Sequence, residues 1–476
     1  MNARHEKDFR MNEQSPLLTS RRDFIKSTST AAVGAGLVGA LAGCKTTPTA
    51  KPGYVAEKNT IQVALIGCGG RGGGAAKNAL MVKYGPTKLV AMADVFEDRL
   101  NTALKNLTRE FPKQVDVPKE RQFIGFDGYK HAIDCLKPGD VAIFTTPLAF
   151  RWVHFTYAIQ KGVNVFMEKP LTADGPTSRR MLKLGEEASA KNLKVGVGLM
   201  SRHHRPLQEL HKRVQDGQIG DILFMRGYRM HGPVASFASE KWPGEPSELL
   251  WQIKRFHSFL WASGGCYNDF YIHHIDHLSW MKNSWPVSAQ GLGGRHYREN
   301  FVDQNFDSYA VEYTYADGAK LYMDGRCMTG CHDIYSSYVH GTKGMAIAAK
   351  SGDFNGPSSI YKGKIPMRKQ MTWESKDIPG EEDPYLNEWN DLIYAIRNDK
   401  PYNETKHGVD GSVASSMGRM AAHTGQLITF DDFLASKQEF APGVDKWTMD
   451  SPPPIKADAN GRYPVPQPGR LKDREY

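Results

Sequence analysis

The sequence predicts two domains: a doubly wound α/β domain with a parallel sheet, then an α+β domain with a largely antiparallel sheet. Two observations predict the first domain. Apolar, β-branched runs alternate with helical segments, and the run IQVALI at 61–66 leads directly into the glycine-rich turn GCGGRG at 67–72. A third observation predicts the second domain, because from about residue 200 the strands lengthen and carry hairpin signals, as in FDSYAVEYTYADGAKLYMDG at 306–325.

The composition is that of an ordinary globular protein. The chain has 476 residues, and 40% of them are hydrophobic, which is enough to fill two cores. Its net charge of +9 comes without a block of lysines and arginines, so we expect no nucleic-acid partner. The cysteines after Cys44 are odd in number and scattered, which argues against a disulfide framework. Cys327, Cys331 and His332 lack a second ligand cluster, so we expect no metal site.

The N-terminal segment resembles an export signal. Paired arginines in SRRDFIKS (20–27) precede the small, apolar run TSTAAVGAGLVGALAGC, which is too short and too rich in glycine to span a bilayer. The pattern resembles a twin-arginine signal, and its end, LAGC, resembles a lipobox in which Cys44 is acylated. We therefore expect a signal at 1–44, a flexible linker at 45–58, and a periplasmic protein whose membrane contact is only a lipid anchor.

The first domain, expected at 59–200, shows repeated strand–helix units. The expected strands are 61–66, 88–94, 141–146, 163–168 and 193–199, and the clearest helices are 151–161 and 174–191. This spacing predicts right-handed crossovers and a Rossmann-type sheet, with a dinucleotide lying across the carboxyl ends of its strands.

The glycine-rich turn is the expected phosphate-binding loop. Its residues Gly67, Gly69, Gly70, Arg71 and Gly72 follow the first strand. Glycines there allow a tight turn, let the backbone approach a pyrophosphate and let the next helix pack with its N-terminus toward the phosphates.

The second strand ends in Asp94, where a carboxylate accepts hydrogen bonds from ribose hydroxyls. Asp94 therefore favours NAD over NADP, although Arg71 leaves room for NADP. Alternatively or in addition, Asp94 caps the helical segment that begins at Phe96.

Two later strand ends carry polar residues. Thr145, Thr146 and Pro147 follow one strand, and the tripeptide Glu168-Lys169-Pro170 follows the next. A lysine beside a nicotinamide can stabilise a substrate hydroxyl as it becomes an alkoxide, while proline fixes the backbone. Taken alone, the tripeptide could equally form a salt bridge in a surface loop.

These motifs together resemble the glucose-fructose oxidoreductase, inositol dehydrogenase and rhizopine-catabolism family (Gfo/Idh/MocA). GCGGRG, TTP and FRWVHFTYAIQKGVNVFMEKPLTAD carry the resemblance, which extends over about residues 59–435. It implies that Lys169 lies at the nicotinamide and substrate, and that His154 belongs to the cofactor-side loop. NEWNDLIYAIRNDKPY (387–402) resembles the family's late helix, which packs back near the first domain. The family's sheets often pair, so we expect a homodimer or homotetramer.

The second domain, expected at 201–436, carries the richest polar segment, GGCYNDFYIHHIDHLSWMK at 264–282. If 268–282 is helical, Asp269 and His273 share a face, and Asp276 follows one turn on, toward the substrate. A carboxylate one turn from an imidazole can hold its tautomer and raise its basicity. The family's Asp-x-x-x-His pair implies that Asp269 and His273 are the acid/base pair.

Alternatives remain for this segment and its neighbours. Asp269, His273 and His277 have a metal-ligand spacing, although a dinucleotide domain does not require a metal, and the histidines could simply fill the interface. Tyr271 stands where many family members have glycine, so it either contacts a sugar or packs. Arg202 in SRHHRP (201–206) could clamp a substrate hydroxyl or carboxylate, or form a linker salt bridge.

The sequence thus predicts an exported, NAD-dependent oxidoreductase acting on a secondary hydroxyl of a sugar or polyol. Because a soluble NAD pool is not expected outside the inner membrane, we expect the cofactor to be tightly bound. One alternative is an NAD-dependent glycosidase of the family 109 type, which works by transient oxidation and elimination. Another is a sugar-binding lipoprotein without turnover. The proline-rich tail at 437–476 is expected to be an extended wrap or disordered.

Overall fold

The computed structural model describes residues 59–476 except 297 and 299. The expected twin-arginine signal, Cys44 and the linker lie outside the described residues. Among the described residues, no helix is both long and apolar enough to cross a membrane.

The first sheet is parallel and doubly wound. Its strands are β1 (Ile61–Ile66), β2 (Thr87–Asp94), β3 (Gln122–Ile124), β4 (Val141–Phe144), β5 (Asn164–Met167) and β6 (Val195–Val197). Their order is β3-β2-β1-β4-β5-β6, and each neighbouring pair is parallel. This is the Rossmann order, so the predicted architecture is confirmed.

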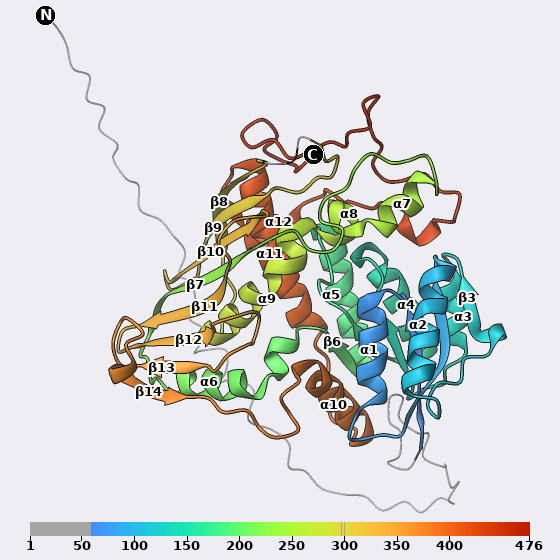
Figure 1. Ribbon diagram of the computed structural model, residues 1–476, viewed down its shortest axis with the longest axis horizontal. Helices are drawn as coiled ribbons and strands as arrows, with labels where there is room; N and C mark the ends of the chain where they lie inside the picture. The colour runs from blue at the N-terminus through green and yellow to red at the C-terminus, as the bar shows by residue number, and fades with distance from the viewer. Residues whose placement is uncertain (1–58, 297, 299) are drawn as a thin grey trace, which may run out of the picture. The chain divides into compact units, whose positions relative to one another are not determined.

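Helices cover both faces of this sheet (Figure 1). They are α1 (Gly70–Leu80), α2 (Glu97–Glu110), α3 (Gly128–Asp134), α4 (Arg151–Lys161) and α5 (Gly175–Ala190). Apolar residues of α1 and α2 share one core with alternate residues of β1, and those of α3, α4 and α5 share the core on its other face. The strand expected at 193–199 is shorter than predicted. The sequence pattern also missed β3, which has only three residues and no β-branched run.

The second sheet is largely antiparallel, as predicted. Its strands are β7 (Ile222–His231), β8 (Ser288–Gly294), β9 (Ser308–Thr314), β10 (Lys320–Cys327), β11 (Ile334–Gly341), β12 (Met345–Ala349), β13 (Ser359–Tyr361), β14 (Met371–Glu374) and β15 (Ile428–Thr429). Their order is β14-β13-β12-β11-β7-β10-β9-β8-β15, and β7 and β10 form its parallel pair. Gly318, with φ of +85°, makes the predicted tight turn between β9 and β10.

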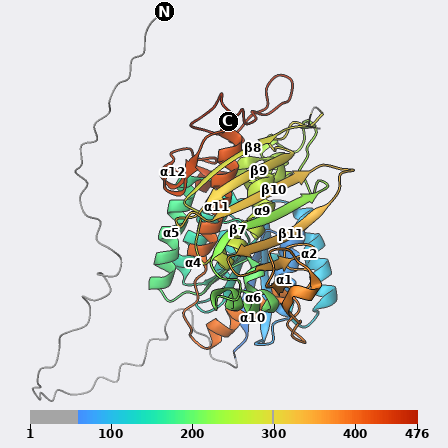
Figure 2. The same cartoon turned by 90° about the vertical axis from the view of Figure 1, so that its left-hand side faces the viewer.

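Helices α9 and α11 lie against one face of the second sheet, behind its strands in the view of Figure 2. The helices of this half are α6 (Arg205–Gln215), α7 (Glu248–Lys254), α8 (Leu260–Ser263), α9 (Gly265–Lys282), α10 (Pro384–Arg397), α11 (Thr405–Thr424) and α12 (Phe430–Ala435). The short 3₁₀ turns are η1 (Lys119–Arg121), η2 (Leu148–Phe150), η3 (Met200–His203), η4 (Phe256–Ser258), η5 (Arg368–Gln370) and η6 (Val444–Lys446). The predicted helix at 268–282 is confirmed, and every residue of α9 except Trp280 and Lys282 is buried.

The late helix α10 returns to the first sheet. Trp389 stacks on Phe166 of β5 with their ring centroids 4.5 Å apart. Val195 of β6 donates its N–H to the carbonyl oxygen of Tyr402 at 2.9 Å. The segment 384–402, which follows β14 of the second sheet in sequence, therefore packs against the first sheet.

The tail at 437–476 is an ordered, extended wrap. Tyr463 packs against Phe259 at 5.0 Å and against Trp251 at 6.2 Å. Near its end, the Glu475 carboxylate accepts hydrogen bonds from Arg419 at 2.7 and 2.9 Å, inside the core. The tail thus buries an aromatic ring and contributes one partner of a buried ion pair.

Candidate active site

The glycine-rich loop has the shape that a dinucleotide diphosphate needs. Gly67 has φ of +94°, and a Cβ on Gly72 would lie 2.0 Å from the carbonyl oxygen of Gly67, so both positions require glycine. By contrast, a Cβ on Gly69 or Gly70 would meet no described heavy atom within 4 Å. Gly69 begins α1 without a side-chain cap, which leaves the first N–H groups of the helix to bind an anion.

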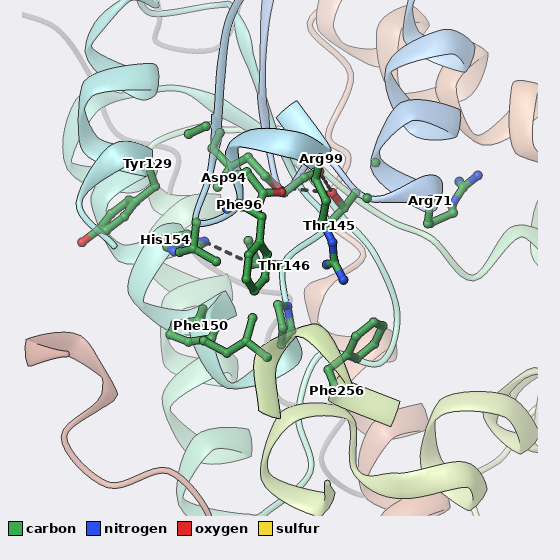
Figure 3. A pocket seen from close by; sticks show the side chains of 18 of the residues that line it. Arg71, Asp94, Phe96, Arg99, Tyr129, Thr145, Thr146, Phe150, His154 and Phe256 are labelled. Carbon is green, nitrogen blue, oxygen red and sulfur yellow. Dashed lines mark hydrogen bonds between the residues drawn. The ribbon is translucent and has the colours of Figure 1, made fainter. Parts of the chain in front are cut away.

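Asp94 lies at the carboxyl end of β2, beside this loop (Figure 3). Its Oδ2 accepts a hydrogen bond from the Cys68 N–H at 2.6 Å, and its Oδ1 accepts one from the Phe96 N–H at 2.9 Å. Burial raises the pKa of Asp94, and these two N–H donors oppose that rise. The carboxylate therefore joins the glycine loop to the start of α2, and each oxygen keeps a lone pair for a ribose hydroxyl.

A cavity of about 340 Å³ extends from this loop. Both halves of the chain line it: Gly67, Gly69–Gly72, Asp94, Phe96, Arg99, Thr145–Pro147, Phe150 and His154 from the first, and Ala235, Ile253, Phe256 and His257 from the second. Figure 3 shows Phe256 facing Asp94 and Phe96 across it. The predicted Gly67, Gly69–Gly72, Asp94, Thr145–Pro147 and His154 thus meet in one place, which fits a dinucleotide.

His154 is a supporting residue of this cavity. Its Nδ1 lies 3.3 Å from Oγ1 of Thr146, and its ring packs on Tyr129 at 4.3 Å. Burial and the nearby Arg151 lower the pKa of His154 to about 3, so the imidazole is neutral. It positions Thr146 within the strand-end turn.

A second cavity of about 280 Å³ adjoins the first. The two share the walls made by Arg71, Thr145, Thr146, Pro147, Phe256 and His257. Charged and polar side chains dominate the remainder: Arg151, Glu168, Lys169, Arg229, Asp269, His273, Asp353 and Tyr385. A substrate here would lie beside the end of a dinucleotide bound in the first cavity.

Lys169 stands at the wall of the second cavity and is tied to α9. Its Nζ donates to the Asp269 carbonyl oxygen at 2.5 Å and lies 3.3 Å from Oδ1 of the same residue. Burial opposes ionisation of Asp269, but Lys169 and His257 outweigh it and lower the pKa of this carboxyl. Lys169 and Asp269, which the sequence analysis assigned separately to the substrate, are thus in direct contact.

The expected partnership of Asp269 with His273 needs correction. Both side chains line the cavity, but the Asp269 oxygens face Lys169 and, at 3.3 Å, Nε2 of His257. Nδ1 of His273 is buried and has no hydrogen-bond partner among the described residues. Burial, opposed mainly by Asp353, lowers the pKa of His273 to about 3. The Asp269 carboxylate therefore does not hold the imidazole of His273, because Lys169 and His257 lie next to its two oxygens instead.

Sequence reasoning missed several residues of this cavity, among them His257, Arg229 and Asp353. His257 lies outside any motif, in RFHSF at 255–259, and its isolation among aromatic residues is the available signal. Arg229 of β7 pairs with Asp353 through Nη1 and Oδ1 at 3.1 Å. Asp353 belongs to the loop between β12 and β13, and His273 and Arg229 lower its pKa despite its burial. Loop residues of this kind carry no periodic signal.

Arg71 points away from the glycine loop that bears it. Its Nε lies 2.5 Å from Oε1 of Glu168, its Nη2 lies 3.3 Å from Oε1 of Glu388, and its guanidinium stacks over the ring of Tyr385 at 4.5 Å. The salt bridge considered for the Glu168 tripeptide is therefore present, with the Glu168 carboxylate buried and the Arg71 side chain partly exposed. Arg71 is held there rather than at the ribose of a bound dinucleotide, which favours NAD over NADP.

Arg202, Asp276 and Tyr271, which were also expected at the substrate, do not line either cavity. Arg202 forms a bidentate pair with Asp276 at 2.8 to 3.1 Å, flanked by Trp280 and Trp285, and neither partner lines the two cavities. Tyr271 is fully buried, with its hydroxyl 3.6 Å from Sγ of Cys266. The assignment of Arg202, Asp276 and Tyr271 to the substrate is thus corrected, because ion pairing and packing account for all three.

Comparisons with known proteins identify this architecture. Residues 207–347 match the family model of the GFO/IDH/MocA C-terminal domain. A scyllo-inositol 2-dehydrogenase (NAD(+)) of Bacillus subtilis is 26% identical over 296 residues, which are 60% of this chain and 73% of that protein. Residues 207–347 are therefore a Gfo/Idh/MocA C-terminal domain, and the relative that matches 60% of the chain is an inositol dehydrogenase. The resemblance expected from GCGGRG, TTP and the Glu-Lys-Pro segment is confirmed.

Two other relatives differ in how much of the chain they match. An inositol 2-dehydrogenase of Corynebacterium glutamicum is 24% identical over 151 residues, and the match covers 32% of this chain and 37% of that relative. A glycosyl hydrolase family 109 protein of Streptomyces coelicolor is 23% identical over 343 residues, covering 68% of this chain and 69% of that protein.

Solved structures match the fold of this chain. Aldose-aldose oxidoreductase from Caulobacter crescentus, complexed with glycerol, has a TM-score of 0.60 at 14% identity and covers 78% of this chain and 100% of its own. scyllo-Inositol dehydrogenase from Lactobacillus casei, with bound NAD(H) and scyllo-inositol, has a TM-score of 0.56 at 19% identity with coverage of 78% and 100%. At these identities the likeness confirms the predicted pairing of a Rossmann sheet with a mostly antiparallel sheet.

Proposed function

We propose that this protein oxidises a secondary hydroxyl of a sugar or cyclic polyol with NAD. One observation carries the proposal: the glycine-loop cavity and the charged cavity share a wall, and Lys169 lines the charged cavity in contact with Asp269. NAD, when bound, would accept hydride from the substrate carbon. The relatives named as inositol dehydrogenases support a polyol substrate.

Lys169 is the group we assign to the reacting oxygen. Its Nζ is held by two oxygens of Asp269, which leaves a third donor position for a substrate hydroxyl. A cation held in place stabilises negative charge that develops on that oxygen as the hydroxyl proton leaves. Asp269 positions the lysine, so its role here is to orient Lys169 rather than to hold His273.

The other walls of the charged cavity would select the substrate. His273 is neutral, because burial holds its pKa near 3, and it offers a hydrogen bond without a charge. Arg229 and Asp353 form a paired wall, and Tyr385 adds a hydroxyl. Closely spaced donors and acceptors of this kind suit a small molecule with several hydroxyl groups.

We further propose that the protein is exported by the twin-arginine route with NAD already bound. The motif SRRDFIKS supports the route, and the lipobox-like LAGC supports acylation at Cys44. The cofactor cavity is walled by Phe256 and Ile253 of the second half as well as by the glycine loop, which favours slow release. A resident cofactor would have to be returned to its starting state within the protein.

The test is a single-turnover assay on the purified protein with a panel of inositols, aldoses and uronic acids. Reduced nicotinamide formed on the protein is followed by absorbance, and acid-released cofactor is quantified in the same preparation. We expect at least one polyol to reduce the bound cofactor. A protein that binds these compounds without reducing any cofactor would be the sugar-binding lipoprotein instead.

A second candidate function is an NAD-dependent glycosidase. It is favoured by the family 109 relative, whose match extends over 68% of this chain. Transient oxidation would acidify a neighbouring C–H bond and let the glycosidic bond leave by elimination. Incubation with a glycoside panel in heavy water separates the two functions, because deuterium exchange with aglycone release indicates the glycosidase and exchange without release indicates the dehydrogenase.

A further inference from the structure

A chain of side chains leads from Lys169 away from the charged cavity. Asp269 presents Oδ1 to Lys169, 3.3 Å from Nζ, and Oδ2 to His257, 3.3 Å from Nε2. The other ring nitrogen of His257, Nδ1, lies 2.9 Å from Oγ of Ser236. Each neighbouring pair is within or close to hydrogen-bond distance, and each member can take up and release a proton.

Ser236 brings this chain to the protein surface. It is partly exposed and directly follows Pro233, Val234 and Ala235, which are exposed in the turn after β7. His257 lines both cavities and has 15% of its side chain exposed. The chain therefore connects the buried lysine to water through one imidazole and one hydroxyl.

His273 offers no comparable route. It lies on the same face of α9 as Asp269 and lines the same cavity, but its buried Nδ1 has no hydrogen-bond partner among the described residues. A proton taken up by this ring has no described neighbour at Nδ1 to which it can pass.

The charged groups facing His257 suit it to relaying a proton rather than storing one. They are Asp269 from α9, Lys169 from the segment after β5, and Arg99 from α2. Burial is the largest cause that lowers the pKa of His257; Lys169 and Arg99 add to it, and Asp269 opposes it. An imidazole that is neutral at rest, with Asp269 near Nε2 and Ser236 at Nδ1, can accept a proton on one side as it releases one from the other.

We propose, resting on the dehydrogenase function above, that Asp269, His257 and Ser236 form the proton exit of the reaction. Lys169 passes a proton from Nζ to Oδ1 of Asp269, and the lone pair that this leaves on Nζ takes the proton of the substrate hydroxyl as its O–H bond breaks, so that the lysine is again a cation beside the alkoxide. The Asp269 carboxyl group turns about its Cβ–Cγ bond and gives this proton to Nε2 of His257, Nδ1 gives its proton to Ser236, and the serine hydroxyl gives a proton to water. One proton enters and one leaves, while the hydride goes from carbon to NAD.

The experiment compares wild type with His257→Gln, His257→Ala, Ser236→Ala and Ser236→Thr, using His131→Gln as the matched control at an exposed histidine of α3. We expect kcat for polyol oxidation, expressed per bound cofactor because His257 also lines the glycine-loop cavity, to fall about 10²-fold in His257→Gln, since a proton-transfer step is lost. It should fall less in Ser236→Ala and stay near wild type in Ser236→Thr, which keeps the hydroxyl. External imidazole should restore part of the rate in His257→Ala.

The pH profile supplies a signature that a purely structural role would not produce. In His257→Gln we expect kcat to rise steadily with pH, because hydroxide replaces the missing acceptor, whereas wild type levels off. Ser236→Ala keeps the test decisive if a His257 variant does not fold, since it removes only a partly exposed hydroxyl.

Two kinds of failure are distinguishable. If wild type oxidises no polyol or sugar, the proposed function fails and the exit path fails with it. If wild type is active while His257→Gln and Ser236→Ala keep its kcat and its pH profile, the exit path alone is overturned. A loss in His257→Ala that imidazole does not relieve, with Ser236→Ala unchanged, also overturns it.

Discussion

The two adjoining cavities are built in opposite ways. The glycine-loop cavity is shaped mostly by backbone: Gly67 and Gly72 leave no space for a side chain, whereas Gly69 and Gly70 leave open space. The charged cavity is shaped by side chains from four distant segments, represented by Lys169, Arg229, Asp269 and Asp353. Backbone shape follows from a short stretch of sequence, whereas a side-chain cavity follows from tertiary packing. The comparison teaches that binding of the cofactor and choice of the substrate are separable properties of this chain.

The largest expected effect falls on the charged cavity alone. Lys169→Ala should lower kcat by about 10³-fold, because it removes the cation at the developing alkoxide. The cofactor content should stay at the wild-type value, since Lys169 is not among the residues that line the glycine-loop cavity. Single-turnover kinetics and acid release of NAD measure both quantities. Lys161→Ala, at an exposed lysine of α4, is the control, and loss of NAD from Lys169→Ala would contradict the separation.

Replacing Gly72 should instead weaken cofactor binding. In Gly72→Ala the added methyl group would lie 2.0 Å from the Gly67 carbonyl oxygen, so the loop must shift. Overpacking of about 1–3 kcal/mol corresponds to roughly 5- to 150-fold weaker cofactor binding. Calorimetric titration of NAD into cofactor-free protein checks this.

Gly73→Ala, one residue further along α1, is the matched control. A Cβ there meets no described heavy atom within 4 Å, so we expect unchanged affinity and a slightly more stable helix. Equal affinities in the two alanine variants would show that the loop is not shaped as described.

Asp353→Asn should sharpen the comparison from the substrate side. It removes the charge that pairs with Arg229 at 3.1 Å, in a wall of the charged cavity that the cofactor cavity does not share. We expect KM for the polyol to rise about 10-fold, because a charge-assisted hydrogen bond is weakened, with cofactor affinity unchanged. Asp450→Asn, at an exposed carboxylate, should leave both unchanged. A fall in NAD affinity in Asp353→Asn would show that cofactor binding depends on the charged cavity and would contradict the separation.

The smallest effect concerns the joint between the two halves, away from both cavities. His203 lies between Asp391 at 2.8 Å and Glu404 at 3.1 Å. Burial opposes its charge, but Glu404 and Asp391 outweigh burial and raise the pKa of His203 to about 10.

Because the folded pKa of His203 exceeds its unfolded value of about 6.5, its stabilising contribution is complete below pH 6.5 and is lost as pH rises toward 10. The melting temperature should therefore fall across this range in wild type, and His203→Gln should show a weaker dependence. Equal slopes in the two proteins would contradict a cationic His203.

The sequence predicts the two cavities unequally for the same physical reason. The glycine turn directly follows β1, and Asp94 ends the neighbouring strand β2. The order of strands in a Rossmann sheet therefore predicts that they meet. Lys169 follows from its place at a strand end. His257 and Asp353 reach the cavity only through packing of η4 and of the loop between β12 and β13, which no periodicity announces.

The wrong assignments have the same origin. Arg202 and Asp276 carry residue types typical of a sugar site, yet they lie close enough to satisfy each other. Asp269 and His273 are spaced for contact along α9, but Lys169 and His257 approach the carboxylate from other elements. Helical spacing shows which side chains can meet, whereas the competing partners come from parts of the chain that spacing does not describe.

Helix α9 restricts how this protein could acquire a new substrate. It carries Asp269 and His273, yet every other residue except Trp280 and Lys282 is also buried, so most substitutions along it would disturb the core before they altered the cavity. The exposed turn at 232–235 and the loop at 350–357 border the same region with fewer packing constraints. Divergence within the family, and libraries built in the laboratory, should therefore change specificity through these two loops while α9 stays nearly invariant.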